Sequence, residues 1–340
     1  MASPHPETWL EPRPEGLYCR PGGFFVDPLR PVGTAVVSHG HADHARPGHD
    51  TVLATAETLA IMQARLGEGA GRARRALAYG EVVEFGEVAV WLAPAGHVLG
   101  SAQVVMEHRG ARVVYSGDYK RTLDPTCAPF EPVPCDVFIT EATFGLPVFR
   151  HPDPMAEIGR LLHSVALFPE RCHVIGTYAL GKAQRVIALL RQAGWARPIW
   201  LHGALQPLCQ LYERHGVALG ELRPATVGEK GQARQELAGE IVLAPPSAVA
   251  DRWARRLPDP VICLASGWMR VKQRAKQRGV ELPLVLSDHA DWGELLATIA
   301  EVGAPEVWIT HGREEALAHE VEKRGIRARA LALVGYEEEA

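Results

Sequence analysis

The residues best suited to chemistry in this chain are histidines and aspartates that follow a short apolar run at residues 34–37. His39 and His41 are two positions apart, so both imidazoles point to the same side if the chain leaves a strand in extended form. They can therefore share one metal ion. Asp43 and His44 follow where the chain turns, and their carboxylate and imidazole suit a second, neighbouring ion. The spacing thus predicts two divalent metal ions.

Two other strand ends carry residues that can complete this cluster. His97 lies in a glycine-flanked turn after the apolar run 90–93, and Asp118 closely follows the apolar run 113–115. Taken singly, a histidine or an aspartate after a strand is usually a turn residue or a helix cap. Loops at strand ends are also where a rigid sheet presents functional groups. Together with the first cluster, these two residues favour a shared metal site.

In these motifs the chain resembles the metallo-β-lactamase superfamily over nearly its whole length. Asp27 matches the first motif, the histidine-rich segment matches the second, and His97 and Asp118 match the third and fourth. The resemblance implies an α/β fold, an αββα sandwich with two metal ions at its edge. One ion would be held by His39, His41 and His97, and the other by Asp43, His44 and a late histidine, with Asp118 bridging both. Asp27 would orient a ligand instead of binding metal.

Three later motifs are similar to motifs A, B and C of the β-CASP nucleases within that superfamily. They are residues 137–145, 287–292 and 309–314. The match implies that Glu141 is an acidic residue hydrogen-bonded to a histidine, that His289 lies near the scissile phosphate, and that His311 is the missing ligand of the second metal. Within the group, residues 265–270 and the segment around His289 most resemble the bacterial ligase-associated DNA exonucleases.

The resemblance implies a metal-dependent nuclease that hydrolyses phosphodiester bonds. Two divalent ions would activate a water molecule for in-line attack on phosphorus, and His289 would offset the negative charge that develops. The predicted catalytic residues are therefore His289, Asp118, Glu141 and Asp43. Histidine and carboxylate ligands suit Zn²⁺ or Mn²⁺, and iron is also compatible.

The predicted substrate is DNA, cleaved by an exonuclease in DNA repair, because of the likeness to the ligase-associated group. A DNA ligase or helicase is then an expected partner. The alternative is an RNA-processing nuclease of the 3′-end-processing or RNase J-like kind, since histidine at the position of His311 is commoner in RNA-processing members. A noncatalytic nucleic-acid-binding subunit is a third hypothesis, although such paralogues usually lose ligands that this chain keeps. A thioester or lactam hydrolase would leave motif B unexplained.

Composition indicates a globular cytoplasmic enzyme. The 340 residues, of which 47% are hydrophobic, suffice for one large or two ordinary domains. No apolar run reaches membrane-spanning length, and the first residues lack the pattern of a signal peptide, so we expect no membrane contact. The six cysteines are scattered without a CxxC pair, which indicates neither a disulfide framework nor a zinc ribbon.

The formal net charge of −4 is unusual for an enzyme that binds nucleic acid. However, residues 270–278 contain five cations and no acidic residue. We expect three of them to bind substrate phosphates: Arg270, Lys272 and Arg274. An ordinary solvated face is the alternative interpretation of this run. Lys182, at the start of a predicted helix, is a further candidate phosphate contact.

The pattern of apolar runs predicts the domain organisation. Short strands joined by glycine turns dominate through about residue 145, around one helix at Ala56–Leu66. From about residue 153 strands alternate with helices, including Lys182–Gln192 and residues 248–256, which predicts a parallel α/β domain. We therefore expect a discontinuous metallo-β-lactamase domain at residues 1–150 and 280–340, and an inserted β-CASP domain at residues 151–279.

Overall fold

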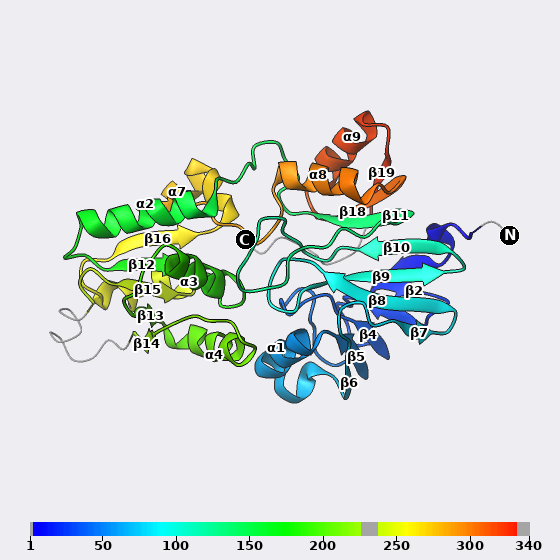
Figure 1. Cartoon of the computed structure of the whole chain (residues 1–340), viewed down its shortest axis with the longest axis horizontal. Coiled ribbons are helices and arrows are strands. Elements are labelled where there is room, and N and C mark those ends of the chain that lie inside the picture. The colour runs from blue at the N-terminus through cyan, green and yellow to red at the C-terminus, as the bar shows by residue number, and fades with distance from the viewer. Residues whose placement is uncertain (1–2, 226–236, 332–340) are drawn as a thin grey trace. The chain divides into compact units, whose positions relative to one another are not determined.

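The computed structural model describes residues 3–225 and 237–331 and divides the chain into two compact units (Figure 1). Unit 1 is formed within Met1–Phe149 and His289–Ala340, so it is discontinuous in sequence. Unit 2 is formed within Arg150–Asp288. Both contain sheets and helices, which gives a mixed α/β fold. None of the helices in the described ranges combines the length and the apolarity that crossing a bilayer requires.

Unit 1 is built on two sheets. The first has six strands, which are neighbours in chain order: β1 (Leu10–Arg13), β2 (Gly16–Cys19), β3 (Phe24–Val26), β4 (Thr34–Val36), β5 (Thr51–Ala54) and β6 (Ala73–Ala76). The second has seven strands in the order β19-β18-β11-β10-β9-β8-β7. These are β7 (Val83–Phe85), β8 (Val88–Pro94), β9 (Ala102–His108), β10 (Ala111–Tyr115), β11 (Val137–Ala142), β18 (Glu306–Gly312) and β19 (Arg327–Ala330).

The two sheets of unit 1 pack face to face, and helices cover their outer faces. Along β10, Val113 and Tyr115 join the core shared by both sheets, whereas Val114 packs in the outer core with the helices α8 (Trp292–Val302) and α9 (Glu314–Lys323). The helix α1 (Ala56–Leu66) packs in the same way on β4 and β5. Because both faces of these strands are buried, they appear in the sequence as nearly continuous apolar runs.

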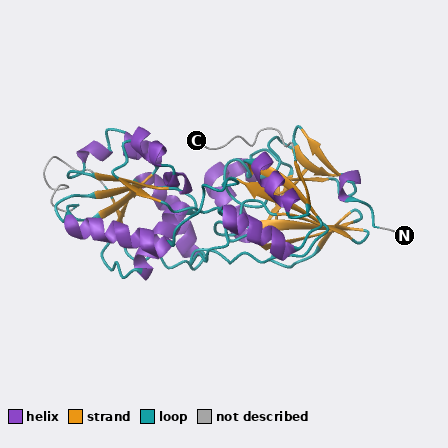
Figure 2. Ribbon diagram, turned by 90° about the horizontal axis from the view of Figure 1, so that it is seen from above, coloured by secondary structure: helices purple, strands orange, loops and turns teal. Residues whose placement is uncertain are grey.

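Unit 2 is a parallel α/β layer structure, as the alternation of strands and helices predicts. Its sheet has the order β14-β13-β15-β12-β16-β17, and every neighbouring pair is parallel. The strands are β12 (His173–Gly176), β13 (Ile199–Leu201), β14 (Leu222–Pro224), β15 (Ile241–Ala244), β16 (Val261–Ala265) and β17 (Leu282–Leu284). Helices lie on both faces (Figure 2): α2 (Pro154–Leu167), α3 (Lys182–Gln192), α4 (Gln206–Arg214), α6 (Pro246–Ala250) and α7 (Lys272–Gln277).

Two local features of unit 2 differ from the sequence-based expectation. The single helix predicted at residues 248–256 is wrong, because α6 ends at Ala250 and a separate 3-10 turn occupies Ala254–Arg256. Asp251 is extended, and its carboxylate accepts the amide of Arg252, a local bond that competes with helix formation. The sheet also continues beyond residue 279, since β17 pairs with β16.

Candidate metal centre

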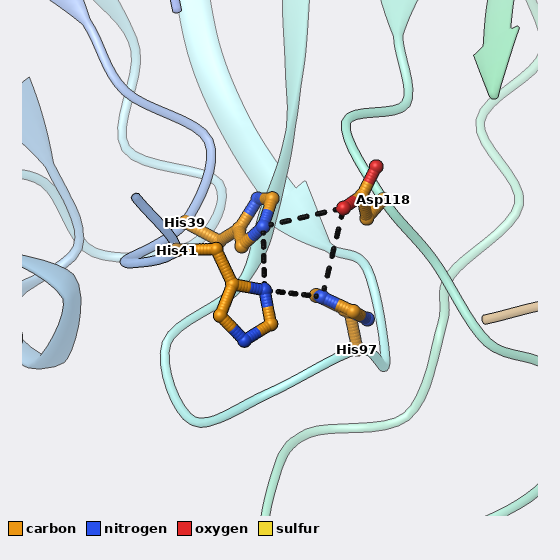
Figure 3. Close-up of side chains that lie close together, drawn as sticks. All are labelled: His39, His41, His97 and Asp118. Carbon is orange, nitrogen blue, oxygen red and sulfur yellow. Dashed lines mark hydrogen bonds and ion pairs between the residues drawn. The ribbon is translucent and has the colours of Figure 1, made fainter. Parts of the chain in front are cut away.

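Four of the predicted ligands converge where three strands of unit 1 end. The Nδ1 atom of His41 lies 3.1 Å from Nε2 of His39 and 2.9 Å from Nε2 of His97 (Figure 3). The Oδ2 atom of Asp118 lies 3.4 Å from Nε2 of His39 and 3.7 Å from Nε2 of His97. One ligand atom from each residue therefore lies within 4.8 Å of the others, a spacing that a single ion can bridge.

A second group shares Asp118 with the first. Nε2 of His44 lies 3.4 Å from Oδ2 of Asp118 and 3.6 Å from Oδ2 of Asp43. Asp118 follows β10 through Gly117, which has a positive φ of 56°. A Cβ atom on Gly117 would come within 2.9 Å of the Ser38 side chain, so glycine allows the two loops to approach closely. The carboxylate of Asp118 is thus the meeting point of both groups.

A buried hydrogen-bond network fixes the Nδ1 atoms of His39 and His44, on the side of each ring that points away from Asp118. Asp27 accepts a hydrogen bond at Oδ2 from Nδ1 of His44, at 2.7 Å, and another from Oγ of Ser38, at 2.5 Å. Because its single proton is donated to Asp27, the Ser38 hydroxyl can accept from Nδ1 of His39, 3.0 Å away. The Nε2 atom of each histidine therefore faces Asp118, and Nε2 is the atom that a metal would bind. Ser38 was not among the residues identified from the sequence, and its position directly before His39 was the available signal.

Glu141 and His289 form a third group with Asp118. Nδ1 of His289 lies 3.0 Å from Oε2 of Glu141 and 4.0 Å from Oδ2 of Asp118. Glu141 also accepts the backbone amide of Tyr119 at 2.7 Å, which fixes its carboxylate. Since Glu141 occupies the Nδ1 side of the imidazole, Nε2 is the atom through which His289 would reach a substrate.

His311 lies next to the second group. Among the described residues, however, its ring nitrogens do not belong to any of the groups whose ligand atoms all lie within 4.8 Å of one another. Its ring stacks on that of His44, with centroids 5.0 Å apart. It occupies a bulge of β18 opposite Glu141 and Ala142, with a positive φ of 56°. A β-bulge redirects a side chain, and this one brings the imidazole over His44. Its role as a metal ligand stays a prediction.

Electrostatics favour positive charge at the centre of the cluster. Burial alone would raise the pKa of Asp118, but His44 and His289 outweigh it and hold this pKa well below the usual range. Burial opposes protonation of His44, yet the carboxylates around it, Asp118 foremost, raise its pKa. Burial lowers the pKa of His39, and it lowers that of His311 to about 4. The ionised Asp118 and the raised pKa of His44 show that the carboxylates attract positive charge, while the lowered pKa values of His39 and His311 favour the neutral imidazole that binds metal. Both properties fit divalent transition-metal ions.

The predicted phosphate contacts lie in unit 2 and differ in exposure. Arg270 and Lys272 are exposed, whereas Arg274 is half-buried over Trp268, with its guanidinium carbon 4.1 Å from the ring centroid. The Lys182 side chain is buried, and its ammonium donates to the Leu286 carbonyl at 3.1 Å and lies 3.0 Å from Oδ2 of Asp288. A phosphate bound by Lys182 would have to compete with this internal ion pair.

Comparisons with known proteins give relatives of two kinds. No family model matches the chain. Over 331 residues it is 30% identical to a protein named "Probable DNA ligase" from Opitutus terrae, a match that covers 93% of this chain and 30% of that protein. It is 35% identical over 125 residues to cleavage and polyadenylation specificity factor subunit 3 of Dictyostelium discoideum, covering 35% of this chain and 16% of that protein.

A third relative is endoribonuclease YSH1 of Saccharomyces cerevisiae, 34% identical over 99 residues, which are 28% of this chain and 13% of that protein. The chain spans less than a third of the length of each of these three relatives. Among solved structures, a protein of unknown function from Enterococcus faecalis V583 is similar with a TM-score of 0.58 and 16% identity. That match covers 90% of this chain and 80% of the other. At this identity the likeness concerns the fold alone.

Proposed function

We propose that this chain is a metal-dependent nuclease of the metallo-β-lactamase superfamily, in its β-CASP branch. Its similarity to cleavage and polyadenylation specificity factor subunit 3 and to endoribonuclease YSH1 supports the superfamily and a metal-dependent hydrolase. The observation that carries the proposal is the clustering of histidine and carboxylate donors around Asp118. In this assignment unit 1 is the metallo-β-lactamase domain, and unit 2 is the β-CASP insert.

We assign the following roles to the residues of unit 1. His39, His41 and His97 would hold one divalent ion, and Asp43, His44 and His311 would hold another, with Asp118 common to both. When bound, such ions, Zn²⁺ or Mn²⁺, lower the pKa of a water molecule and polarise a phosphate oxygen. Asp27 and Ser38 keep two imidazoles in the tautomer that presents Nε2 to the ion.

His289 would act on the substrate itself. Glu141 accepts a hydrogen bond from Nδ1 and so orients the ring, which leaves Nε2 to donate to a nonbridging phosphate oxygen. A hydrogen bond from a fixed imidazole offsets the negative charge that grows on this oxygen as the diester is attacked.

We propose DNA as the substrate and exonucleolytic repair as the role. The support is the relative named as a probable DNA ligase, because the match to it covers 93% of this chain and 30% of that protein. RNA is the second candidate, favoured by the endoribonuclease among the relatives. A DNA ligase is accordingly the expected partner in the first case.

The test is incubation of the purified protein with end-labelled single- and double-stranded DNA and RNA, with Zn²⁺ or Mn²⁺ added. A metal-dependent ladder of short products on DNA is the expected result. Cleavage confined to RNA would support the second candidate. Absence of cleavage from all four substrates, with metal bound, would contradict the nuclease.

A further inference from the structure

Unit 2 contains a cavity of about 660 Å³ between α6, the 3-10 turn Ala254–Arg256 and the segment that follows α7. Its lining is mostly aliphatic and includes Val249, Ile262, Leu264 and Val280. The exposed arginines Arg255 and Arg278 also line it. The cavity therefore joins an apolar surface to two guanidinium groups.

No described residue neutralises the positive charge of this cavity. Within residues 3–225 and 237–331, no residue that lines the cavity is acidic, and neither Arg255 nor Arg278 forms an ion pair. A second cavity of unit 2, of about 390 Å³, is also largely apolar and contains Arg197. There the guanidinium is paired with Glu240. The larger cavity thus retains charge for an external anion, whereas the smaller one does not.

The cavity also adjoins the basic run at residues 270–278. Helix α7 carries most of that run, and its last residue, Gln277, lines the cavity together with Arg278. A polyanion that follows the cations of α7 would therefore arrive at the cavity. An anion alone would leave the aliphatic lining unused, so the best occupant has both negative charges and a flat apolar body.

We propose that this cavity binds one nucleotide of a single-stranded nucleic acid, with its base against the aliphatic lining and the flanking phosphates on Arg255 and Arg278. The inference rests on the proposed nuclease function and adds a substrate-binding site to it. A guanidinium group can bind two phosphate oxygens at once, and the faces of a base can pack against apolar side chains. A base inside a duplex is stacked on its neighbours, so only a single strand can offer one.

The first test measures binding by the metal-free, full-length protein to short fluorescein-labelled oligothymidylate and oligouridylate as salt is varied. The double variant Arg255→Gln/Arg278→Gln should weaken binding about tenfold and lower the log–log salt slope by roughly 0.7 for each phosphate that is no longer bound. The control is Arg223→Gln, which removes one positive charge, so twice its effect is the change expected from net charge alone. Arg223 is an exposed arginine of the same unit that is already paired with Glu221 at 2.6 Å.

The second test asks whether the base enters the cavity. An abasic strand of the same length should bind wild-type protein roughly tenfold more weakly than oligothymidylate, because it has no base to pack on the lining. Ala250 lines the cavity, so Ala250→Glu should weaken binding more than Ala250→Gln, a substitution of the same shape without charge. A duplex of equal length should bind more weakly than the single strand.

The outcomes separate this site from the nuclease itself. If the double variant changes the salt slope by no more than twice the change in Arg223→Gln, or if the abasic strand binds as tightly as oligothymidylate, the nucleotide site is wrong. Because binding is measured without metal, a protein that binds as described but cleaves no labelled strand would keep the site and overturn the nuclease. If the wild-type protein cleaves the labelled strands and these variants bind normally, the nuclease is supported and the nucleotide site is wrong.

Discussion

Asp118 is the residue on which both predicted metal positions depend, because its Oδ2 atom lies against imidazoles of both ligand groups. Asp118→Asn keeps the shape but removes the charge that His44 and His289 stabilise. We expect about two ions per chain in the wild type and a marked loss of bound metal in the variant. Activity should fall by more than the roughly 10–100-fold typical of losing an outer hydrogen-bond partner. Elemental analysis and turnover measure the two effects.

The control for this substitution is Asp50→Asn. Asp50 is an exposed carboxylate of unit 1 that pairs with the exposed Arg72, so its loss should leave metal content and turnover near wild type. Full metal occupancy and normal turnover in Asp118→Asn would contradict the dinuclear centre.

His289 tests the boundary between metal binding and catalysis. If its Nε2 atom serves the phosphate, His289→Ala should lower turnover by roughly 10²–10⁴, the range for a positioned acid or charge stabiliser. Metal content should stay near wild type. Loss of an ion would instead mean that His289, Glu141 and Asp118 hold metal themselves, as their mutual distances permit.

At the scale of single residues, the sequence predicted that the histidines and Asp118 cluster. It predicted fewer of the contacts that orient each side chain. His39 and His41 converge because a two-residue spacing places both on one side of an extended segment. The Ser38 hydroxyl gains its role only because Asp27 lies beside it, and that contact joins different loops. Likewise, the position of His311 depends on a bulge whose partner residues lie on another strand. Non-local contacts of this kind leave no periodic signal in a sequence.

The element that most changes the interpretation of a residue is α3. Lys182 and Arg185 lie in its first turn, where the helix dipole disfavours cations. Both side chains are buried, and Asp288 compensates them, with one carboxylate oxygen near each. The contact of Lys182 with an external phosphate stays a prediction. Its ion pair with Asp288 was not visible in the sequence, because Asp288 is remote along the chain. The bounds of α3 were predictable from the local pattern, whereas this partner was not.

Strand β12 also carries a buried ionisable residue, His173. Its ring is buried, with Nε2 2.9 Å from Oγ of Ser164 on α2. Burial, with the positive charge of Arg171, lowers its pKa from 6.5 to about 4. The unfolded chain therefore binds a proton at a higher pH than the folded one. The stability contributed by the neutral ring is present above pH 6.5 and is lost as the pH falls toward 4.

This linkage predicts that lowering the pH from about 7 to about 5 reduces the free energy of unfolding by on the order of 1–2 kcal/mol through His173 alone. His173→Gln retains a polar group near Ser164 but cannot titrate, so its free energy of unfolding should change less over the same interval. Urea unfolding of both proteins at the two pH values gives the comparison. Equal pH dependence would show that His173 is not the group responsible.

At the scale of the whole molecule, the order of elements explains why the candidate centre needs both ends of unit 1. The chain supplies its first six ligand candidates before residue 119, leaves for unit 2, and returns with His289 and His311. The mixed α/β class was predictable, since apolar strands buried on both faces and alternating helices leave clear patterns. The return of the chain to unit 1 was expected from the likeness of the segments around His289 and His311 to motifs B and C. The end of unit 2 was less predictable, because β17 is short and is defined only by its pairing with β16.

The net charge of −4 means that phosphate binding must depend on a local concentration of cations. Near the candidate centre, Lys120 and Arg121 are already paired with Asp124 and Glu301. The basic run at residues 270–278 is the stronger candidate. In the described structure Arg270 and Lys272 are exposed, and neither forms an ion pair there.

Replacing Arg270, Lys272 and Arg274 with Gln in an Asp118→Asn background should weaken oligonucleotide binding similarly across sequences. The salt slope should fall by about one unit for each phosphate that the variant no longer binds, because binding a phosphate releases counterions. The control removes the same charge from three exposed arginines that are paired with carboxylates: Arg72, Arg109 and Arg324. An equal effect of the two triple variants would mean that the run is a solvated face acting only through net charge. A larger fall in slope for the run would identify it as the surface that the nucleic acid follows.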